Sequence, residues 1–77
     1  MDIKVLGTGC PKCRALEKAV INSLSELKIQ ADVNKVEDIM QIMQYGVMRT
    51  PALVINGKVV LSGRIPDDKE LKSILTQ

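Results

Sequence analysis

The sequence has almost no aromatic residues: Tyr45 is the only one, and tryptophan, phenylalanine and histidine are absent. A core without aromatic rings has to be aliphatic, and the hydrophobic fraction of 45% is typical of a globular protein. Binding to single-stranded nucleic acid needs aromatic platforms, and binding to a duplex needs a basic stripe. The net charge is only +2, with basic and acidic residues interspersed. We therefore expect no nucleic-acid partner.

Long hydrophobic runs are also missing. The longest apolar run has four residues, Ala52 to Ile55, whereas a membrane-spanning helix needs about 20. The first six residues carry no signal-peptide pattern and read directly as a strand. We therefore expect a cytoplasmic monomer without a membrane partner, folded as one domain over residues 1–77.

Cysteine is scarce as well, and both cysteines, Cys10 and Cys13, lie within four residues. A disulfide between them would close a loop too short to constrain the unfolded chain by much. In a reducing compartment such a pair is more often catalytic or metal-binding than structural. The cysteines are therefore predicted to serve chemistry rather than stability.

Hydrophobic periodicity predicts the order β-α-β-α-β-β-α. Two strands joined through a helix should be parallel, and an Asn56-Gly57 turn favours a final antiparallel hairpin. The prediction is an α/β fold with a four-stranded mixed sheet and helices on its faces. The expected strands are residues 2–6, 29–34, 52–55 and 58–61. The first expected helix covers residues 11–28. The second is capped by Asn34, has apolar residues from Val36 to Val47 and stops at Gly46, and a terminal helix is capped by Asp67.

The Cys-Pro-Lys-Cys sequence falls at the start of the first predicted helix, with Cys10 at the N-cap and Cys13 as the third helical residue. The unpaired N–H groups and the positive end of the helix dipole stabilise a thiolate there. Lys12 adds a neighbouring positive charge. Such settings lower the pKa of a cysteine thiol from about 8.5 to roughly 3.5–7.5. Cys10 is therefore predicted to attack a disulfide, and Cys13 to resolve the mixed disulfide.

One further residue, Pro11, supports this chemistry. Pro11 suits the first helical position and fixes φ, which keeps the two sulfurs in one turn. A tetrahedral zinc site needs four ligands, and the chain offers no third cysteine and no histidine. We therefore expect a redox pair and no metal.

Two motifs in this order, Cys-Pro-x-Cys at a helix start and Thr-Pro before a hairpin, resemble those of the thioredoxin/glutaredoxin superfamily. The likeness is closest to the minimal thioredoxin-like redox-active disulfide proteins of archaea and bacteria. It implies a thioredoxin-like fold and a thiol–disulfide oxidoreductase with Cys10 and Cys13 as catalytic residues. It also implies a cis peptide bond before Pro51, with Thr50 offering its backbone to an extended substrate.

The resemblance implies no cofactor beyond the Cys10–Cys13 disulfide. Its implied partners are disulfide-containing proteins and a thiol or reductase that donates electrons. Glutaredoxins bind glutathione through a Gly-Gly pair followed by an acid, but residues 62–67 contain one glycine and an intervening Pro66. Asp67 is predicted to be a helix cap instead.

Two other functions compete with this one. Heavy-metal carriers also place Cys-x-x-Cys after a first strand and hold copper(I) or another soft metal with two thiolates. Their order is β-α-β-β-α-β, which differs from the order predicted here. The chain could also be an interaction protein with an adaptable surface of Met40, Met43 and Met48. We expect these methionines to fill the aliphatic core instead.

Overall fold

The computed structural model describes residues 1–76. Its elements follow the predicted order β-α-β-α-β-β-α. They are β1 (Asp2–Leu6), α1 (Pro11–Leu27), β2 (Asp32–Val36), α2 (Ile39–Gln44), β3 (Ala52–Ile55), β4 (Lys58–Ser62) and α3 (Asp68–Leu75).

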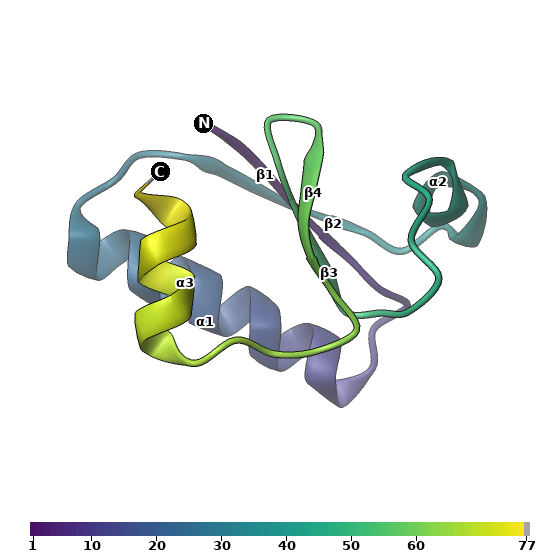
Figure 1. The fold of residues 1–77 in the computed structure, drawn as a ribbon, viewed down its shortest axis with the longest axis horizontal. Helices are drawn as coiled ribbons and strands as arrows, with labels where there is room; N and C mark the ends of the chain where they lie inside the picture. Colours follow the sequence, from purple (N-terminus) through teal and green to yellow (C-terminus); the bar gives the residue numbers. More distant parts are fainter. Residues whose placement is uncertain (77) are drawn as a thin grey trace.

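The four strands form one mixed sheet in the order β2-β1-β3-β4 (Figure 1). Strand β1 runs parallel to β2 and antiparallel to β3, and β3 pairs antiparallel with β4. Asn56 and Gly57 both have positive φ, 51° and 83°, as a tight hairpin turn requires. The mixed sheet and its terminal hairpin confirm the predicted fold class.

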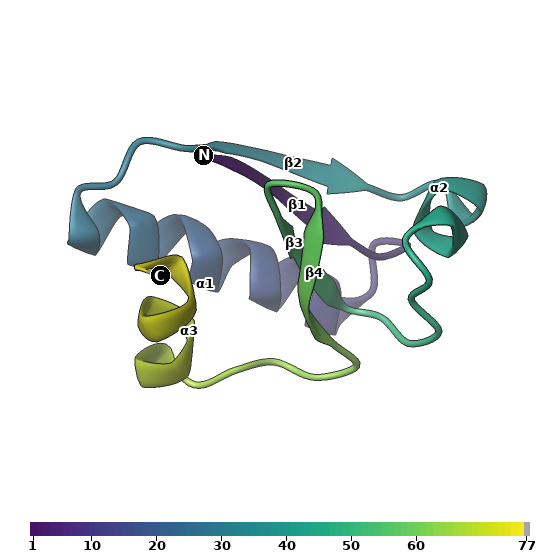
Figure 2. The ribbon, with the colours of Figure 1, turned by 45° about the horizontal axis from the view of Figure 1, so that its top comes forward.

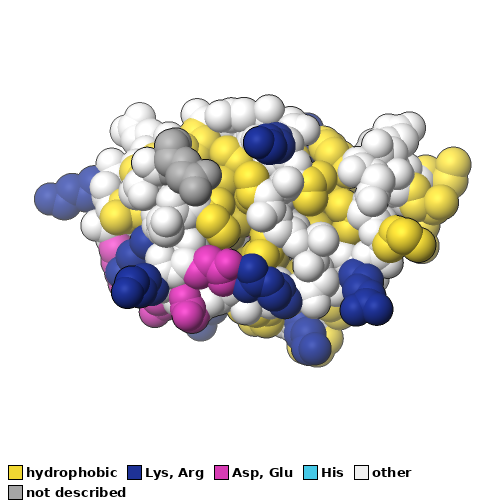
Figure 3. All heavy atoms as spheres, viewed as in Figure 1, with side chains coloured by type: hydrophobic (Ala, Val, Ile, Leu, Met, Phe, Trp, Pro, Cys, Tyr) yellow, Lys and Arg dark blue, Asp and Glu magenta, His cyan; other side chains and the backbone are white. Residues whose placement is uncertain are grey.

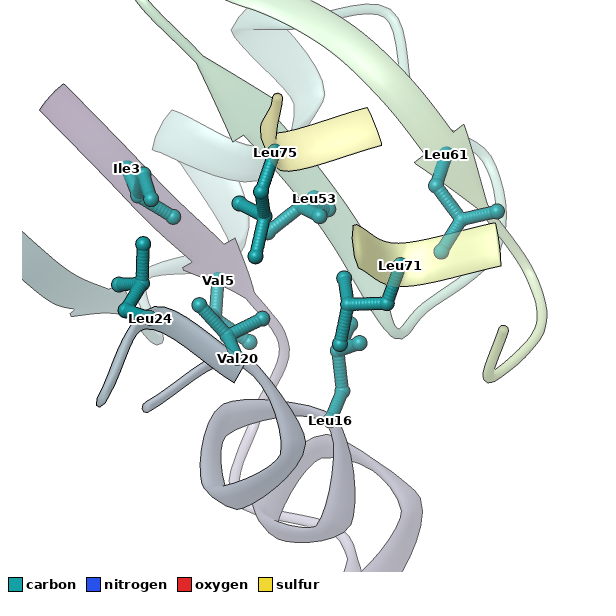
Figure 4. Close-up of a cluster of buried hydrophobic side chains, with 9 residues drawn as sticks. All are labelled: Ile3, Val5, Leu16, Val20, Leu24, Leu53, Leu61, Leu71 and Leu75. Atoms are coloured by element: carbon teal, nitrogen blue, oxygen red, sulfur yellow. The ribbon is translucent and has the colours of Figure 1, made fainter. Parts of the chain in front are cut away.

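Helices α1 and α3 lie side by side on one face of the sheet (Figures 1 and 2). Their inner side chains meet those of β1, β3 and β4 in one continuous aliphatic cluster (Figure 4). Burial of each such side chain stabilises the fold by about 1.5–3 kcal/mol. The cluster consists of Ile3, Val5, Leu16, Val20, Leu24, Leu53, Leu61, Leu71 and Leu75.

The opposite face of the sheet carries a smaller cluster. It joins the alternate residues of the strands to α2, which lies at the far end of the molecule from α3 (Figures 1 and 2). Its buried members are Leu6, Val36, Ile42, Val47, Ala52 and Val54. Within residues 1–76, no helix is both long enough and apolar enough to cross a membrane.

The predicted second strand, residues 29–34, is shifted from the observed one, Asp32–Val36. Ile29, which was expected to start this strand, forms part of the turn that ends α1 instead. Lys28 adopts a left-handed conformation with φ 56°, and the Ile29 N–H donates to the Leu24 carbonyl at 3.0 Å. The strand then starts where parallel pairing with β1 becomes available, at Asp32 opposite Asp2.

The predicted second helix was too long, and its predicted cap, Asn34, is wrong. Strand β2 continues to Val36 because that residue still pairs with Leu6 of β1. Helix α2 therefore starts only at Ile39, capped by Asp38, whose Oδ1 atom accepts from the Met40 N–H at 3.0 Å. The stop at Gly46 is confirmed: the helix ends at Gln44, and Gly46 has φ 75°.

The expectation that the methionines fill the core is wrong. Met40, Met43 and Met48 are 68%, 65% and 97% exposed. Leucine, valine, isoleucine and one alanine side chain already form the buried members of both clusters. Because α2 has only six residues, it turns a single hydrophobic side chain, Ile42, into the second cluster.

Candidate active site

The cysteine pair lies where β1 passes into α1. Cys10 is the N-cap of α1, and Cys13 is its third residue, as predicted. The two cysteines form a disulfide with their Cα atoms 5.1 Å apart. The Cys13 N–H points to the Cys10 Sγ atom at 3.3 Å, and the Arg14 N–H donates to the Cys10 carbonyl at 3.1 Å. The first turn of the helix therefore holds both sulfurs together and directs an N–H at Cys10.

The two cysteines differ in exposure. Cys10 is half-buried, whereas Cys13 is only 5% exposed. Pro11 occupies the first helical position, and both Pro11 and Lys12 are exposed. The first turn of α1 contains no acidic residue. A negative charge on Cys10 would thus face helix N–H groups with no carboxylate in that turn to oppose it.

Gly7 allows β1 to pass close to Cys13. A Cβ atom placed on Gly7 would overlap the Sγ atom of Cys13 and lie 2.9 Å from its Cβ atom. The same point is 3.9 Å from the Cβ atom of Thr50. Gly7 is therefore required by close packing, and Thr50 lies beside the buried sulfur. Sequence reasoning missed the role of Gly7, although a glycine directly after a strand can signal such an approach.

The Thr50–Pro51 segment, directly before β3, is distant from the cysteines in sequence but lies near Cys13 in the fold. Its peptide bond is cis, as the resemblance implied. Pro51 is buried, Thr50 is exposed, and the Pro51 carbonyl accepts from the Gly63 N–H at 2.9 Å. A Cβ atom on Gly63 would lie 3.3 Å from the Cβ atom of Arg49. The loops before β3 and after β4 therefore pack together beside the cysteine pair.

A cavity of about 220 Å³ flanks Cys13 on the side of β2. Three charged residues, Arg14, Lys35 and Glu37, contribute to its wall. The Lys35 Nζ atom lies 3.8 Å from Glu17 and 4.0 Å from Glu37. The surroundings of the buried sulfur on this side are therefore polar and mixed in charge.

A larger hollow of about 470 Å³ involves neither the cysteines nor the Thr-Pro motif. Its lining includes Lys4 and Tyr45, and the Lys4 Nζ atom donates to the Tyr45 hydroxyl at 3.2 Å. This hydrogen bond, reinforced by Asp2, raises the pKa of Lys4. The Lys4–Tyr45 hydrogen bond at this hollow therefore joins β1 to the residue that follows α2.

Residues 62–67, which were compared with a glutathione site, have a structural role here. Asp67 caps α3 by accepting from the Glu70 N–H at 2.7 Å, which confirms the predicted cap. Arg64 forms a bidentate pair with Glu70 at 2.6 and 2.5 Å. This pair lowers the pKa of Glu70 and raises that of Arg64. The polar groups of this stretch are thus engaged with α3.

The fold, with a helix-capping disulfide packed beside a cis-proline loop, is that of the thioredoxin-like thiol–disulfide oxidoreductases. Residues 1–76 match the family model described as a thioredoxin domain. A thioredoxin of Methanothermobacter thermautotrophicus is 36% identical over 99% of both chains. A thioredoxin of Methanocaldococcus jannaschii is 37% identical over 95% of this chain and 84% of its own.

A probable thioredoxin of Archaeoglobus fulgidus is also similar, at 36% identity over 86% of this chain and 75% of its own. The chain belongs to the thioredoxin family. It is a thiol–disulfide oxidoreductase.

Proposed function

We propose that the chain reduces or exchanges disulfides of other proteins through the Cys10–Cys13 dithiol. One observation carries the proposal: the more exposed cysteine caps a helix and is bonded to a buried cysteine one turn further on. Thiolate is the attacking species in disulfide exchange, and a helix N-terminus favours it. Cys10 is therefore the attacking residue, and Cys13 resolves the intermediate.

The reaction proceeds in two exchanges. The Cys10 thiolate attacks one sulfur of the substrate disulfide; the substrate S–S bond breaks, a mixed disulfide forms, and the other substrate sulfur leaves as a thiolate. Cys13 then loses its proton, and its Sγ atom attacks Cys10 Sγ, releasing the second substrate sulfur. Two electrons and two protons pass from the dithiol to the substrate. The product disulfide is the Cys10–Cys13 bond of the structure.

Four residues assist these steps. Pro11 keeps the pair within the first turn, and Lys12 adds positive charge near the attacking sulfur. Thr50 and Pro51 form the substrate-facing wall, since Thr50 is exposed beside Cys13 and Pro51 lies buried behind it. The Thr50 backbone pairs with an extended segment of the substrate in the manner of an added strand.

The remaining proposals follow from this chemistry. A thiol or reductase returns the disulfide to the dithiol, and no further cofactor is required. A reducing compartment such as the cytoplasm maintains this cycle. The protein acts as a monomer, because one chain supplies both cysteines and the substrate wall. Its partners include neither nucleic acid nor a membrane.

The test measures the rate at which the protein reduces insulin disulfides in the presence of dithiothreitol. We expect Cys10→Ser to abolish the exchange. With dithiothreitol removed after reduction of the protein, Cys13→Ser should leave Cys10 joined to its substrate as a mixed disulfide detectable by mass spectrometry. Thr76→Ser, an exposed conservative change at the end of α3, is the control. Unchanged exchange in Cys10→Ser would refute the assignment; tight copper(I) binding without exchange would support the metal carrier instead.

A further inference from the structure

The segment from α2 to the Thr-Pro motif exposes an unusual amount of hydrophobic surface. Seven large hydrophobic side chains of the described chain are exposed, and four of them fall within residues 39–48. These four, Ile39, Met40, Met43 and Met48, are called the methionine surface below. In Figure 3 hydrophobic side chains gather at the end of the molecule that carries α2. Methionine is flexible and polarizable, so such a surface adapts to partners of varied shape.

One member of the methionine surface, Met48, lies two residues before Thr50 of the proposed active site. Met48, at 97% exposure, is separated from Thr50 only by Arg49. Thr50 in turn lies beside Cys13, because the point where a Cβ atom of Gly7 would overlap the Cys13 Sγ atom is 3.9 Å from the Thr50 Cβ atom. A polypeptide that pairs with Thr50 while its disulfide meets Cys10 therefore reaches Met48 with its neighbouring side chains.

Three cations near the cysteine pair and the Thr-Pro motif are available to such a polypeptide. Lys12, Arg14 and Arg49 are exposed and form no salt bridge within residues 1–76. Dark-blue side chains adjoin the hydrophobic end in Figure 3. Opposite charge on an approaching partner speeds association and excludes partners of like charge.

The acidic residues at this end already have partners. Glu37 lies 4.0 Å from the Lys35 Nζ atom, and Asp38 caps α2 through the Met40 N–H. Glu17 also faces Lys35, at 3.8 Å. Lys35 therefore offsets part of the glutamate charge, whereas no salt bridge within residues 1–76 offsets that of Arg49.

We infer that the substrates are protein disulfides flanked by an acidic residue and a large apolar residue, which contact Arg49 and Met48. The inference rests on the proposed function and deepens it. Burial of apolar side chains against Met48 holds the substrate, and attraction by Arg49 and Lys12 raises the encounter rate. Substrates with basic flanking residues are disfavoured, because Arg49 and Lys12 repel their positive charges.

The experiment compares reduction of synthetic peptides that share one disulfide loop. Their flanks are glutamate with leucine, lysine with leucine, or glutamate with serine. Uncharged hydroxyethyl disulfide is the reference substrate. We expect the reduced protein to react with the glutamate–leucine peptide on the order of tenfold faster than with the lysine–leucine peptide at low salt. The advantage should shrink as salt screens the charges.

Variants then locate the effect. Arg49→Ala should lower the ratio of the glutamate–leucine to the lysine–leucine rate, and Arg49→Lys should retain it. Met48→Ser should lower the ratio of the glutamate–leucine to the glutamate–serine rate. Lys58→Ala is the matched control, because it removes an exposed cation from the β3–β4 hairpin. The neighbouring Asn56 contacts Asp2, at the end of β1 opposite to the cysteine pair. Lys58→Ala should therefore leave both ratios unchanged.

The outcomes distinguish a failure of the proposed flank preference from a failure of the proposed disulfide-exchange function. If all peptides and hydroxyethyl disulfide react at similar rates, the protein is an exchanger without this preference and the inference is overturned. If none of them reacts, including hydroxyethyl disulfide, the proposed function itself fails. A ratio that Lys58→Ala lowers as much as Arg49→Ala does would show that net charge, rather than this surface, makes the distinction.

Discussion

Helices α1 and α3 place five leucine and valine side chains in the main cluster, whereas α2 places only Ile42 in the second one. Yet α2, with the sequence Ile-Met-Gln-Ile-Met-Gln, has the same kind of apolar periodicity. The difference is geometric. Helix α1 spans 17 residues and packs against α3 and the sheet, while α2 spans six residues, less than two turns, at the end of the sheet. Apolar periodicity therefore indicates which residues can be buried, and neighbouring elements decide which of them are.

The largest expected difference between the two regions concerns packing. Leu16 is fully buried between α1 and the sheet, so Leu16→Ala should lower the free energy of unfolding by about 2–5 kcal/mol. Met40→Ala on α2 should change it by less than about 0.5 kcal/mol, since Met40 is 68% exposed. Urea unfolding of the oxidised protein measures both. Equal costs would show that α2 is packed as tightly as α1.

A second prediction concerns the α1 side, where β1 passes close to the disulfide. Gly7→Ala forces a methyl group onto Cys13 and should cost about 1–3 kcal/mol. The same substitution in a Cys13→Ala background should cost less, because the sulfur that it meets is gone. Unfolding of the four proteins of this double-mutant cycle gives the coupling energy. The absence of coupling would contradict the close approach of β1 to Cys13.

The two aspartate caps allow a matched comparison. Asp67→Ala and Asp38→Ala each remove one side-chain acceptor from a helix N-terminus. We expect Asp67→Ala to lower the global free energy of unfolding by about 0.5–2 kcal/mol, because α3 carries Leu71 and Leu75 into the core. Asp38→Ala should mainly speed amide exchange in α2, which can open locally. A global loss of the same size in both variants would argue against local opening of α2.

The smallest effect concerns pH on the α3 side. Arg64 lowers the pKa of Glu70 below its ordinary value of 4.5, so the folded state binds this proton less readily than the unfolded state. The resulting stabilisation is present above pH 4.5 and is lost as the pH falls through the lower folded-state value. Glu70→Gln should therefore flatten the acid limb of a stability–pH curve slightly, since the pair is exposed. An unchanged acid limb would mean that the ion pair contributes nothing measurable.

Much of the fold could be read from local signals. The bounds of β1 and β3, the Asn56-Gly57 turn, the Asp67 cap and the position of Cys10 were predicted as they occur. Each depends on residues within a few positions of one another. The bounds of β2 and the start of α2 were not predicted, because pairing with β1 places the strand at Asp32–Val36, against the local helical period at its end.

The sequence by itself determined the chemistry of this protein. Cys10 and Cys13 lie one helical turn apart, and Pro11 between them favours the helix start, so a helix-capping cysteine pair follows from four consecutive residues. Only the tertiary structure decided what surrounds that pair. Gly7 and Thr50 meet beside Cys13 because β1 and β3 are neighbours in the sheet. Met40 and Met43 remain exposed because no element covers their side of α2 within the described chain, and this exposure is a property of packing rather than of composition.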